Sequence, residues 1–252
     1  FAVNTQTPIY GFICAAIAGA LLSVMFAVLT QYIMSNQVAT GLGLTMVGLG
    51  LSALIGKPYE GIKSPTLSKI EIPILSDIPI LGPMIFSHDA IVYFSVILVA
   101  TVAFVISKTR IGLVLRAVGE NQEAAHALGY KVVRIRFLAI MFGGATAGIG
   151  GAYISLARVP QWTEGMTAGA GWIALALVVF ASWKPWRVLL GAYLFGGITV
   201  LQLNLQAIGV AIPVEILSMS PYLVTIVVLV GISLFGHHTA PGSLARPFHA
   251  SQ

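Results

Sequence analysis

Uncharged polar side chains inside apolar runs are the residues of this sequence best suited to binding a solute. The run 188–208 carries Gln202, Asn204 and Gln206, and such amides could line a passage for a neutral, hydrogen-bonding molecule. They could equally join neighbouring helices by hydrogen bonds inside a membrane. Trp172 could stack on a ring or anchor a span at the membrane interface. The candidate pathway residues are Gln37, Thr45, Trp172, Gln202 and Asn204; polar residues of the same kind are Thr30, Gln31 and Thr146.

Motifs that indicate catalysis are missing from the sequence. Gly56-Lys57 is not part of a phosphate-binding loop, because Pro58 follows it and Leu51 stands where the first glycine is required. There is no HExxH or GxSxG motif, and the adjacent pair His237-His238 would point to different faces of a helix. No acid or base lies in the middle of an apolar run, which argues against a proton relay. We therefore expect no enzyme activity and no metal site in this chain.

Composition places the chain in a membrane. Hydrophobic residues make up 58% and charged residues 8%, against roughly 25% charged residues in soluble domains. The net charge of +5 does not indicate nucleic-acid binding, because the basic residues lie beside apolar runs. Cys14 is the single cysteine, which excludes a disulfide within the chain. The sequence begins at Phe1 without an initiator Met or a charged leader, so we expect the natural N-terminus to be missing.

Seven apolar runs are candidates for membrane-spanning helices. The predicted fold is therefore an all-α polytopic membrane helix bundle of about seven spans, forming a single transmembrane domain over residues 1–252. The fifth run is short and could be tilted, broken or partly re-entrant. Glycines in the second run, and Gly144 and Gly148 in the fourth, would let helices approach closely. The runs are 10–33, 38–55, 90–107, 137–156, 169–183, 188–208 and 221–235.

The charges of the connecting segments predict the orientation. Loop 108–136 holds six of the thirteen basic residues, and Lys184, Arg187 and Arg246 fall on the same side if the spans alternate. The opposite side carries more acids than bases, including those of the long Pro-rich loop 57–89. The positive-inside rule therefore places loop 108–136 and the C-terminus in the cytoplasm. Loop 57–89 is expected to be external, extended and close to the membrane surface.

A short helix is predicted at the centre of loop 108–136. Asn121 can cap its N-terminus, Glu123 suits the positive end of the helix dipole, and Gly129 can end it in a left-handed conformation. The helix Gln122–Leu128 would have about two turns, and helices this short are marginal in water. It should therefore need a surface or a partner.

This loop resembles the cytoplasmic coupling loop of ABC importer permeases, whose signature is Glu-Ala-Ala, three residues and then Gly. Glu123-Ala124-Ala125 and Gly129 match that spacing, whereas the Ile-x-Leu-Pro that follows in the fuller signature is absent. That departure resembles the permeases for branched-chain amino acids, simple sugars and nucleosides. Asn36-Gln37-Val38, Gly56-Lys57-Pro58-Tyr59 and the tail 241–247 are similar to nucleoside (purine-type) permeases.

The resemblance implies a mechanism and a set of partners. Gln122–Leu128 would be the coupling helix, docked on a separate ATP-binding subunit that binds ATP and Mg. Ala124, Ala125 and Leu128 would offer an apolar face, with Glu123 and nearby arginines making polar contacts. A second, related permease subunit would complete the pore, and an extracytoplasmic solute-binding lipoprotein would deliver nucleosides. The implied location is the cytoplasmic (inner) membrane of a prokaryote. The implied coupling residues are Glu123, Ala124, Ala125, Leu128 and Gly129.

Three alternatives remain open at this stage. The same permease role could serve branched-chain amino acids or simple sugars. An ATP-independent secondary transporter or channel would use loop 108–136 only as a solvated connector, although no charge in a span could carry its coupling. An intramembrane enzyme is disfavoured by the missing nucleophile and metal motifs.

Overall fold

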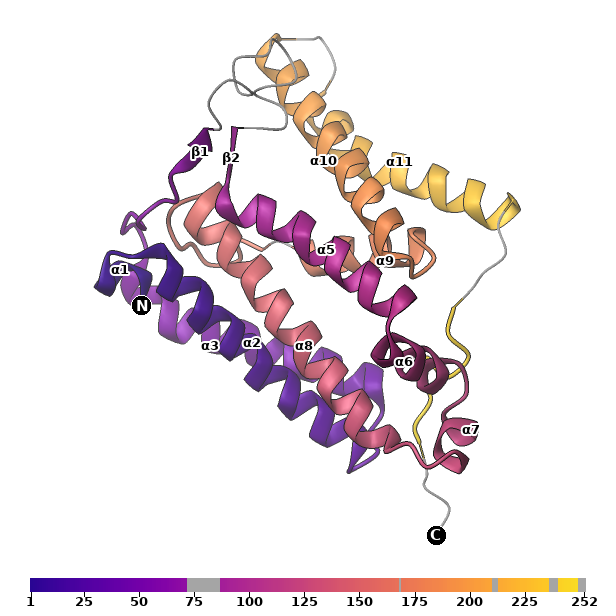
Figure 1. Cartoon of the computed structure of the whole chain (residues 1–252). Coiled ribbons are helices and arrows are strands. Elements are labelled where there is room, and N and C mark those ends of the chain that lie inside the picture. Colours follow the sequence, from indigo (N-terminus) through magenta and orange to yellow (C-terminus); the bar gives the residue numbers. More distant parts are fainter. Residues whose placement is uncertain (72–86, 168, 210–212, 236–239, 249–252) are drawn as a thin grey trace. The chain divides into compact units, whose positions relative to one another are not determined.

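The computed structural model describes residues 1–71, 87–167, 169–209, 213–235 and 240–248. Within these ranges the chain is almost wholly helical (Figure 1), which confirms the predicted helical bundle class. The helices are α1 (Ala2–Thr5), α2 (Pro8–Gln31), α3 (Gln37–Gly56), α5 (Ala90–Lys108), α6 (Arg110–Glu120), α7 (Gln122–Ala127), α8 (Val132–Tyr153), α9 (Ala170–Phe180), α10 (Pro185–Ala207) and α11 (Val214–Phe235). Two short helical turns, η1 (Lys57–Tyr59, 3₁₀) and η2 (Ile154–Arg158, π), follow α3 and α8.

The chain divides into two compact units. Unit 1 consists of Phe1–Ser95, Val114–Ala168 and Gly242–Gln252, and unit 2 of Val96–Leu113 and Gly169–Pro241. Helices α1, α2, α3, α7 and α8 therefore belong to unit 1, and α9, α10 and α11 to unit 2. The single domain expected over residues 1–252 stays a prediction.

Helices α2 and α8 of unit 1 lie side by side along their length (Figure 1). A Cβ atom added at Gly144 would overlap the side chain of Ser23, and one added at Gly148 would overlap the carbonyl oxygen of Ala15. On α2, Ala15, Gly19 and Ser23 recur every fourth residue and form the matching surface. The two backbones approach closely because these side chains are small. The predicted packing role of Gly144 and Gly148 is confirmed.

Four glycines of α3, Gly41, Gly43, Gly48 and Gly50, do not form such a contact within the described chain. Gly43, Gly48 and Gly50 have no atom within 4 Å of an added Cβ, and Gly41 meets only the Phe26 ring at 3.8 Å. No residue of α3 is buried. These four glycines therefore make no close backbone contact in the described part of this chain, and their expected role in helix packing in lipid stays a prediction.

Five described helices are long and apolar enough to cross a membrane: α2, α3, α5, α8 and α10. The predicted fifth span contains α9, whose eleven residues rise only about 16 Å, roughly half the hydrocarbon thickness. This agrees with the expectation of a short or broken segment. The seventh predicted span lies in α11, which has 22 residues. The predicted count of seven spans is not confirmed.

Within unit 2, α10 packs against α9 and α11. An added Cβ at Gly191 of α10 would lie 2.9 Å from the Phe180 ring of α9. Phe195 and Tyr222 form an edge-to-face ring pair between α10 and α11, with centroids 6.0 Å apart. Lys184 is the N-cap of α10 and Pro185 its first residue, a position that suits proline because the first N–H has no helical partner.

Loop 57–89 has extended parts, as predicted, where it is described. Strand β1 (Lys69–Glu71) pairs antiparallel with β2 (Ser87–Asp89). Before β1, the chain lies against the segment that follows η2. The Ser64 amide donates to the Pro160 carbonyl at 2.8 Å, and Lys63 forms an isolated antiparallel β-bridge with Gln161 through the backbone. Most of the Ile- and Pro-rich stretch of this loop, residues 72–86, lies outside the described residues.

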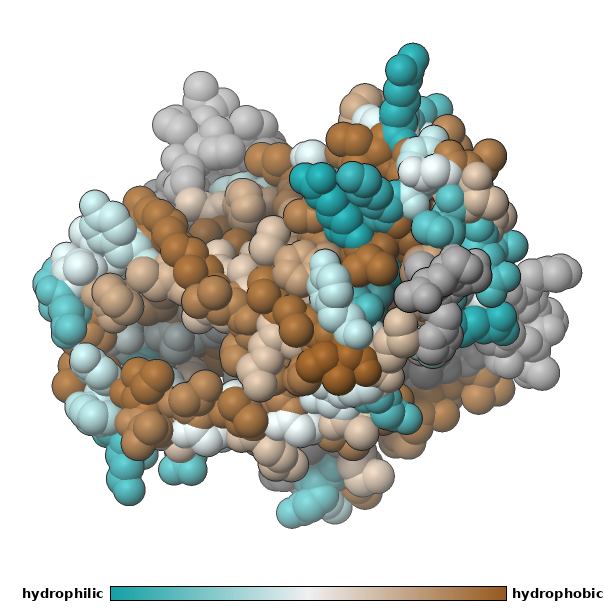
Figure 2. All heavy atoms as spheres, turned by 90° about the horizontal axis from the view of Figure 1, so that it is seen from below, coloured by the Kyte–Doolittle hydropathy of each residue, from teal (hydrophilic) through white to brown (hydrophobic). Residues whose placement is uncertain are grey.

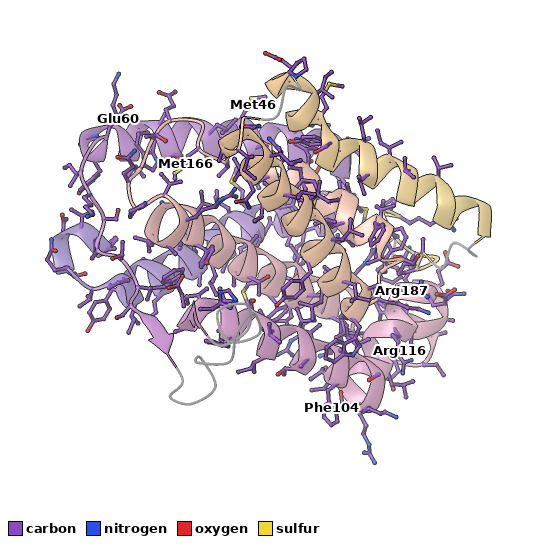
Figure 3. All side chains as sticks on the ribbon, turned by 90° about the horizontal axis from the view of Figure 1, so that it is seen from above. Met46, Glu60, Phe104, Arg116, Met166 and Arg187 are labelled. Atoms are coloured by element: carbon purple, nitrogen blue, oxygen red, sulfur yellow. The ribbon has the colours of Figure 1, made fainter. Side chains whose placement is uncertain are left out.

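Large apolar side chains cover much of the helical surface. Figure 2 shows hydrophobic residues spread over a wide area of one face, and Figure 3 labels two of the exposed ones, Met46 on α3 and Phe104 on α5. Exposed apolar surface on this scale is characteristic of helices whose solvent is lipid. Together with the five apolar helices, it indicates a multi-pass membrane protein.

Candidate functional site

The predicted helix at the centre of loop 108–136 is present as α7, with the expected ends. The Asn121 side chain accepts hydrogen bonds from the amides of Glu123 (3.1 Å) and Ala124 (3.0 Å). Leu128 is the C-cap, and Gly129 has a φ of 87°, which glycine adopts without strain. Both predicted caps are confirmed.

The two sides of α7 differ in exposure. Glu123 and Ala124 are exposed, and Leu128 is 76% exposed. Ala125 is only 2% exposed and packs against Val118 and the rest of an apolar cluster. The expected place of Ala125 on the docking face is therefore wrong: its side chain holds α7 to the protein. The cluster consists of Val118, Ala125, Val132 and Phe248, with Val114, Val133 and Ile135 packed against it.

Helix α6 was not predicted from the sequence. Ile111, Val114, Leu115 and Val118 follow the i, i+3, i+4, i+7 spacing of an amphipathic helix. Thr109 begins it, since the Thr109 Oγ1 accepts a hydrogen bond from the amide of Gly112 at 3.2 Å. Both signals are present in the sequence, but the basic residues of loop 108–136 were interpreted only as a topology signal. The opposite face carries Arg116, which is exposed (Figure 3).

The C-terminal tail packs on this region over Gly242–Phe248, which we call the C-terminal strap (Figure 1). Its Ser243 amide donates to the Gly119 carbonyl at 2.9 Å. Three further bonds join it to α7 and α8: Gln122 Nε2 donates to the Pro247 carbonyl at 2.9 Å, and Arg136 donates to the Ser243 and Arg246 carbonyls at 3.0 Å each. These contacts join residues more than one hundred positions apart, so no local pattern could reveal them.

The candidate pathway residues are divided between the units. Gln37 and Thr45 lie on α3 of unit 1, where Gln37 follows the N-cap Asn36 and the Thr45 hydroxyl donates to the Gly41 carbonyl at 2.8 Å. Trp172 on α9 is 64% exposed. Gln202 and Asn204 lie two residues apart on α10 and so face different directions. The pathway role of all five residues stays a prediction.

Two other polar residues of the apolar runs behave as packing groups. Thr30 and Gln31 are buried at the end of α2. The Thr30 hydroxyl donates to the Phe26 carbonyl at 2.8 Å, and Gln31 Nε2 donates to Thr30 Oγ1 at 3.3 Å. Their hydrogen bonds are made within their own helix, which fits a structural role.

No group of three or more His, Cys, Asp or Glu side chains that could hold a metal ion occurs in the described part of the chain. The pair His237-His238, expected to point to different faces of a helix, lies outside the described residues.

Comparison with known proteins gives the family. The family described as "Branched-chain amino acid transport system / permease component" matches residues 1–233. The chain belongs to this permease family. The motif Glu123-Ala124-Ala125 with Gly129 is therefore found in a member of the permease class that it resembles.

The most similar relatives considered are ABC transporter permeases. The chain is 37% identical to permease protein TsgC13 of Haloferax volcanii, over 91% of this chain and 77% of the relative. The name of TsgC13 gives glucose as a provisional substrate. It is 33% identical to the nucleoside permease protein NupC of Lactococcus lactis, over 90% and 74%. It is also 33% identical to the guanosine permease protein NupQ of Bacillus subtilis, over 98% and 79%. No solved structure matches the chain.

These relationships decide the class of protein. The chain is an ABC transporter permease subunit, a transport component of a system that includes an ATP-binding subunit. A self-sufficient carrier and an intramembrane enzyme, both open from the sequence, are thereby disfavoured. The five apolar helices agree with a permease that crosses the membrane several times.

Proposed function

We propose that this chain carries nucleosides inward across the cytoplasmic (inner) membrane of a prokaryote, driven by ATP that a separate subunit binds with Mg²⁺ and hydrolyses. The observation that carries the proposal is the exposed face of α7. This short helix is fixed at both ends and on its inner side, while Glu123, Ala124 and Leu128 remain exposed.

In this proposal α7 is the coupling helix and docks in a groove of the ATP-binding subunit. Ala124 and Leu128 supply apolar contact, and Glu123 supplies a charge for a basic group in the groove. Closure of two ATP-binding subunits would then move α7 and bias the spans between inward-open and outward-open states. Ala125 does not contact the ATP-binding subunit in this proposal; it packs α7 against Val118 and Val132.

The orientation and the other partners follow from this role. α6, α7 and the C-terminal strap would lie in the cytoplasm, in agreement with the basic residues of loop 108–136. The external loop, with its pairing of β1 and β2, would face a solute-binding lipoprotein. A second, related permease subunit would complete the pore, and the exposed apolar helix surfaces would face that subunit and the lipid bilayer.

Nucleosides are the proposed substrate class, supported by the names of NupC and NupQ together with the sequence segments around Asn36 and Gly56. The name of TsgC13 favours a sugar as the second candidate, and branched-chain amino acids are the third. Gln37, Thr45, Trp172, Gln202 and Asn204 are the proposed pathway residues, because amides and hydroxyls can hydrogen-bond a neutral solute and an indole can stack on a base.

The substrate class can be tested on the solute-binding protein that this proposal assigns to the transporter. Guanosine, adenosine, uridine, glucose, ribose and leucine are added one at a time, and the thermal midpoint is measured. A true ligand at about one hundred times its Kd stabilises the binding protein by about 2.7 kcal/mol. We expect nucleosides to raise the midpoint by about 5 °C. Selective stabilisation by glucose, ribose or leucine contradicts the nucleoside proposal.

A further inference from the structure

Ser243 of the C-terminal strap hydrogen-bonds to both sides of the hinge between α6 and α7. The last carbonyls of one helix and the first amides of the next lack helical partners. Ser243 supplies three of the missing partners: its amide donates to the Gly119 carbonyl at 2.9 Å, its hydroxyl donates to the Glu120 carbonyl at 3.3 Å, and the hydroxyl accepts from the Gln122 amide at 3.1 Å. One side chain from the distant C-terminus thus ties both helix ends together.

The remaining strap residues join α7 to the start of α8. The Arg136 guanidinium of α8 donates to two strap carbonyls, and the Gln122 side chain of α7 donates to a third. Phe248 is 6% exposed within the apolar cluster, and its ring meets His126 of α7 edge to face, with centroids 5.3 Å apart. The strap therefore fills the space between the two helices and hydrogen-bonds to both.

The strap lies too close to α6 to be a loosely attached tail. A Cβ added at Gly242 would lie 2.7 Å from the Glu120 carbonyl oxygen, so glycine is required for this approach. Ala245 turns the chain with a φ of 58°. A six-residue helix such as α7 has little stability of its own, and only Gln122 and Ala125 of its residues are buried. The orientation of α7 must therefore be set by the residues that pack against its buried side, and the strap supplies several of them.

We propose that the C-terminal strap, Gly242–Phe248, is a positioning element that fixes the orientation of α7 on α8, so that displacement of α7 moves α8 as well. The inference rests on the proposed coupling role of α7. Since α8 is in close backbone contact with α2 through Gly144 and Gly148, a displacement passed to α8 reaches α2 in the same unit. Without the strap, α7 would turn on its hinge and the displacement would be lost.

The functional test uses the assembled transporter in proteoliposomes, with guanosine as the transported probe. Ser243→Ala and Phe248→Ala remove the hinge hydroxyl and the buried ring. Both variants should keep the ATP-binding subunit and hydrolyse ATP, while the ATP hydrolysed per guanosine transported rises at least threefold. Ser243→Thr keeps a hydroxyl and should restore the ratio, and Leu244→Ala, at an exposed strap residue, should leave it unchanged.

An orientation measurement decides the inference whether or not guanosine is the solute. Spin labels are placed on Ala127 of α7 and Phe142 of α8, both exposed, with Cys14→Ser to remove the native thiol. We expect one narrow distance distribution in the parent transporter and a clearly broader one after Phe248→Ala. An unchanged distribution, or an unchanged ATP-to-guanosine ratio in a parent that transports it, overturns the inference. Loss of the ATP-binding subunit from both variants overturns it too, because the strap would then serve assembly.

Failure of this inference can be told apart from failure of the proposed coupling role. If Glu123→Arg abolishes co-purification of the ATP-binding subunit while the strap variants behave as the parent, α7 is the docking helix and only the strap inference is wrong. If Glu123→Arg has no effect, the coupling role itself is wrong.

Discussion

Helix α8 is held in two different ways along its length. At its cytoplasmic end, by the proposed orientation, Arg136 and Val132 meet α7 and the C-terminal strap through hydrogen bonds and one small apolar cluster. Further along, Gly144 and Gly148 meet α2 through direct backbone approach. The first region depends on the hydrogen-bonding and apolar side chains that form its contacts. The second depends on glycines, because any larger side chain there would push the two helices apart. Deletions should therefore harm the first region, and additions the second.

The largest effect is expected from adding a side chain at the helix contact. Gly148→Leu would drive a side chain into the backbone of α2 at Ala15, and overpacking of this kind costs about 3 kcal/mol. We expect little folded permease in the membrane and a strongly lowered thermal midpoint in detergent. Gly143→Leu is the matched control, because Gly143 lies on the same helix with no atom within 4 Å of an added Cβ. Equal behaviour of the two variants would show that α2 and α8 are not packed as described.

A smaller effect is expected from removing the N-cap of α7, in the region where α8 meets α7 and the strap. Asn121→Ala deletes the acceptor of the Glu123 and Ala124 amides, which costs about 1 kcal/mol. Hydrogen exchange of the first amides of α7 should become about fivefold faster, with α8 unchanged. Asn36→Ala is the control: Asn36 caps α3 with the same two bonds, so it should speed exchange in α3 only. No change in α7 after Asn121→Ala would contradict the role of this cap.

The comparison also explains which parts of the structure could be predicted. Asn121, Gly129 and the Gly144–Gly148 spacing are local signals, because a cap or a small-residue face acts within one helix. Helix α6 was equally visible in its apolar spacing from Ile111 to Val118. It was missed because its basic residues were interpreted only as a topology signal.

Other features could not be predicted for a physical reason. Ala125 is buried in the same cluster as the distant Phe248, and the contacts of Ser243 and Arg136 join segments more than one hundred residues apart. Gly43, Gly48 and Gly50 of α3 have the composition of a packing face, but an added Cβ at each would meet no atom within 4 Å in the described chain. A single sequence shows that a face can pack closely, but it does not show what lies against it.

The central claim is that the exposed face of α7 docks on the ATP-binding subunit. Glu123→Arg reverses a charge on that face without touching the cap, the cluster or the strap. Glu60→Arg, at an exposed residue before β1, is the matched control. Placing like charges together in an interface costs several kcal/mol, and each 1.4 kcal/mol is tenfold in affinity. The account predicts that the ATP-binding subunit co-purifying with the Glu123→Arg permease falls at least tenfold, with the control unchanged. Co-purification of Glu123→Arg at the parental level would contradict it.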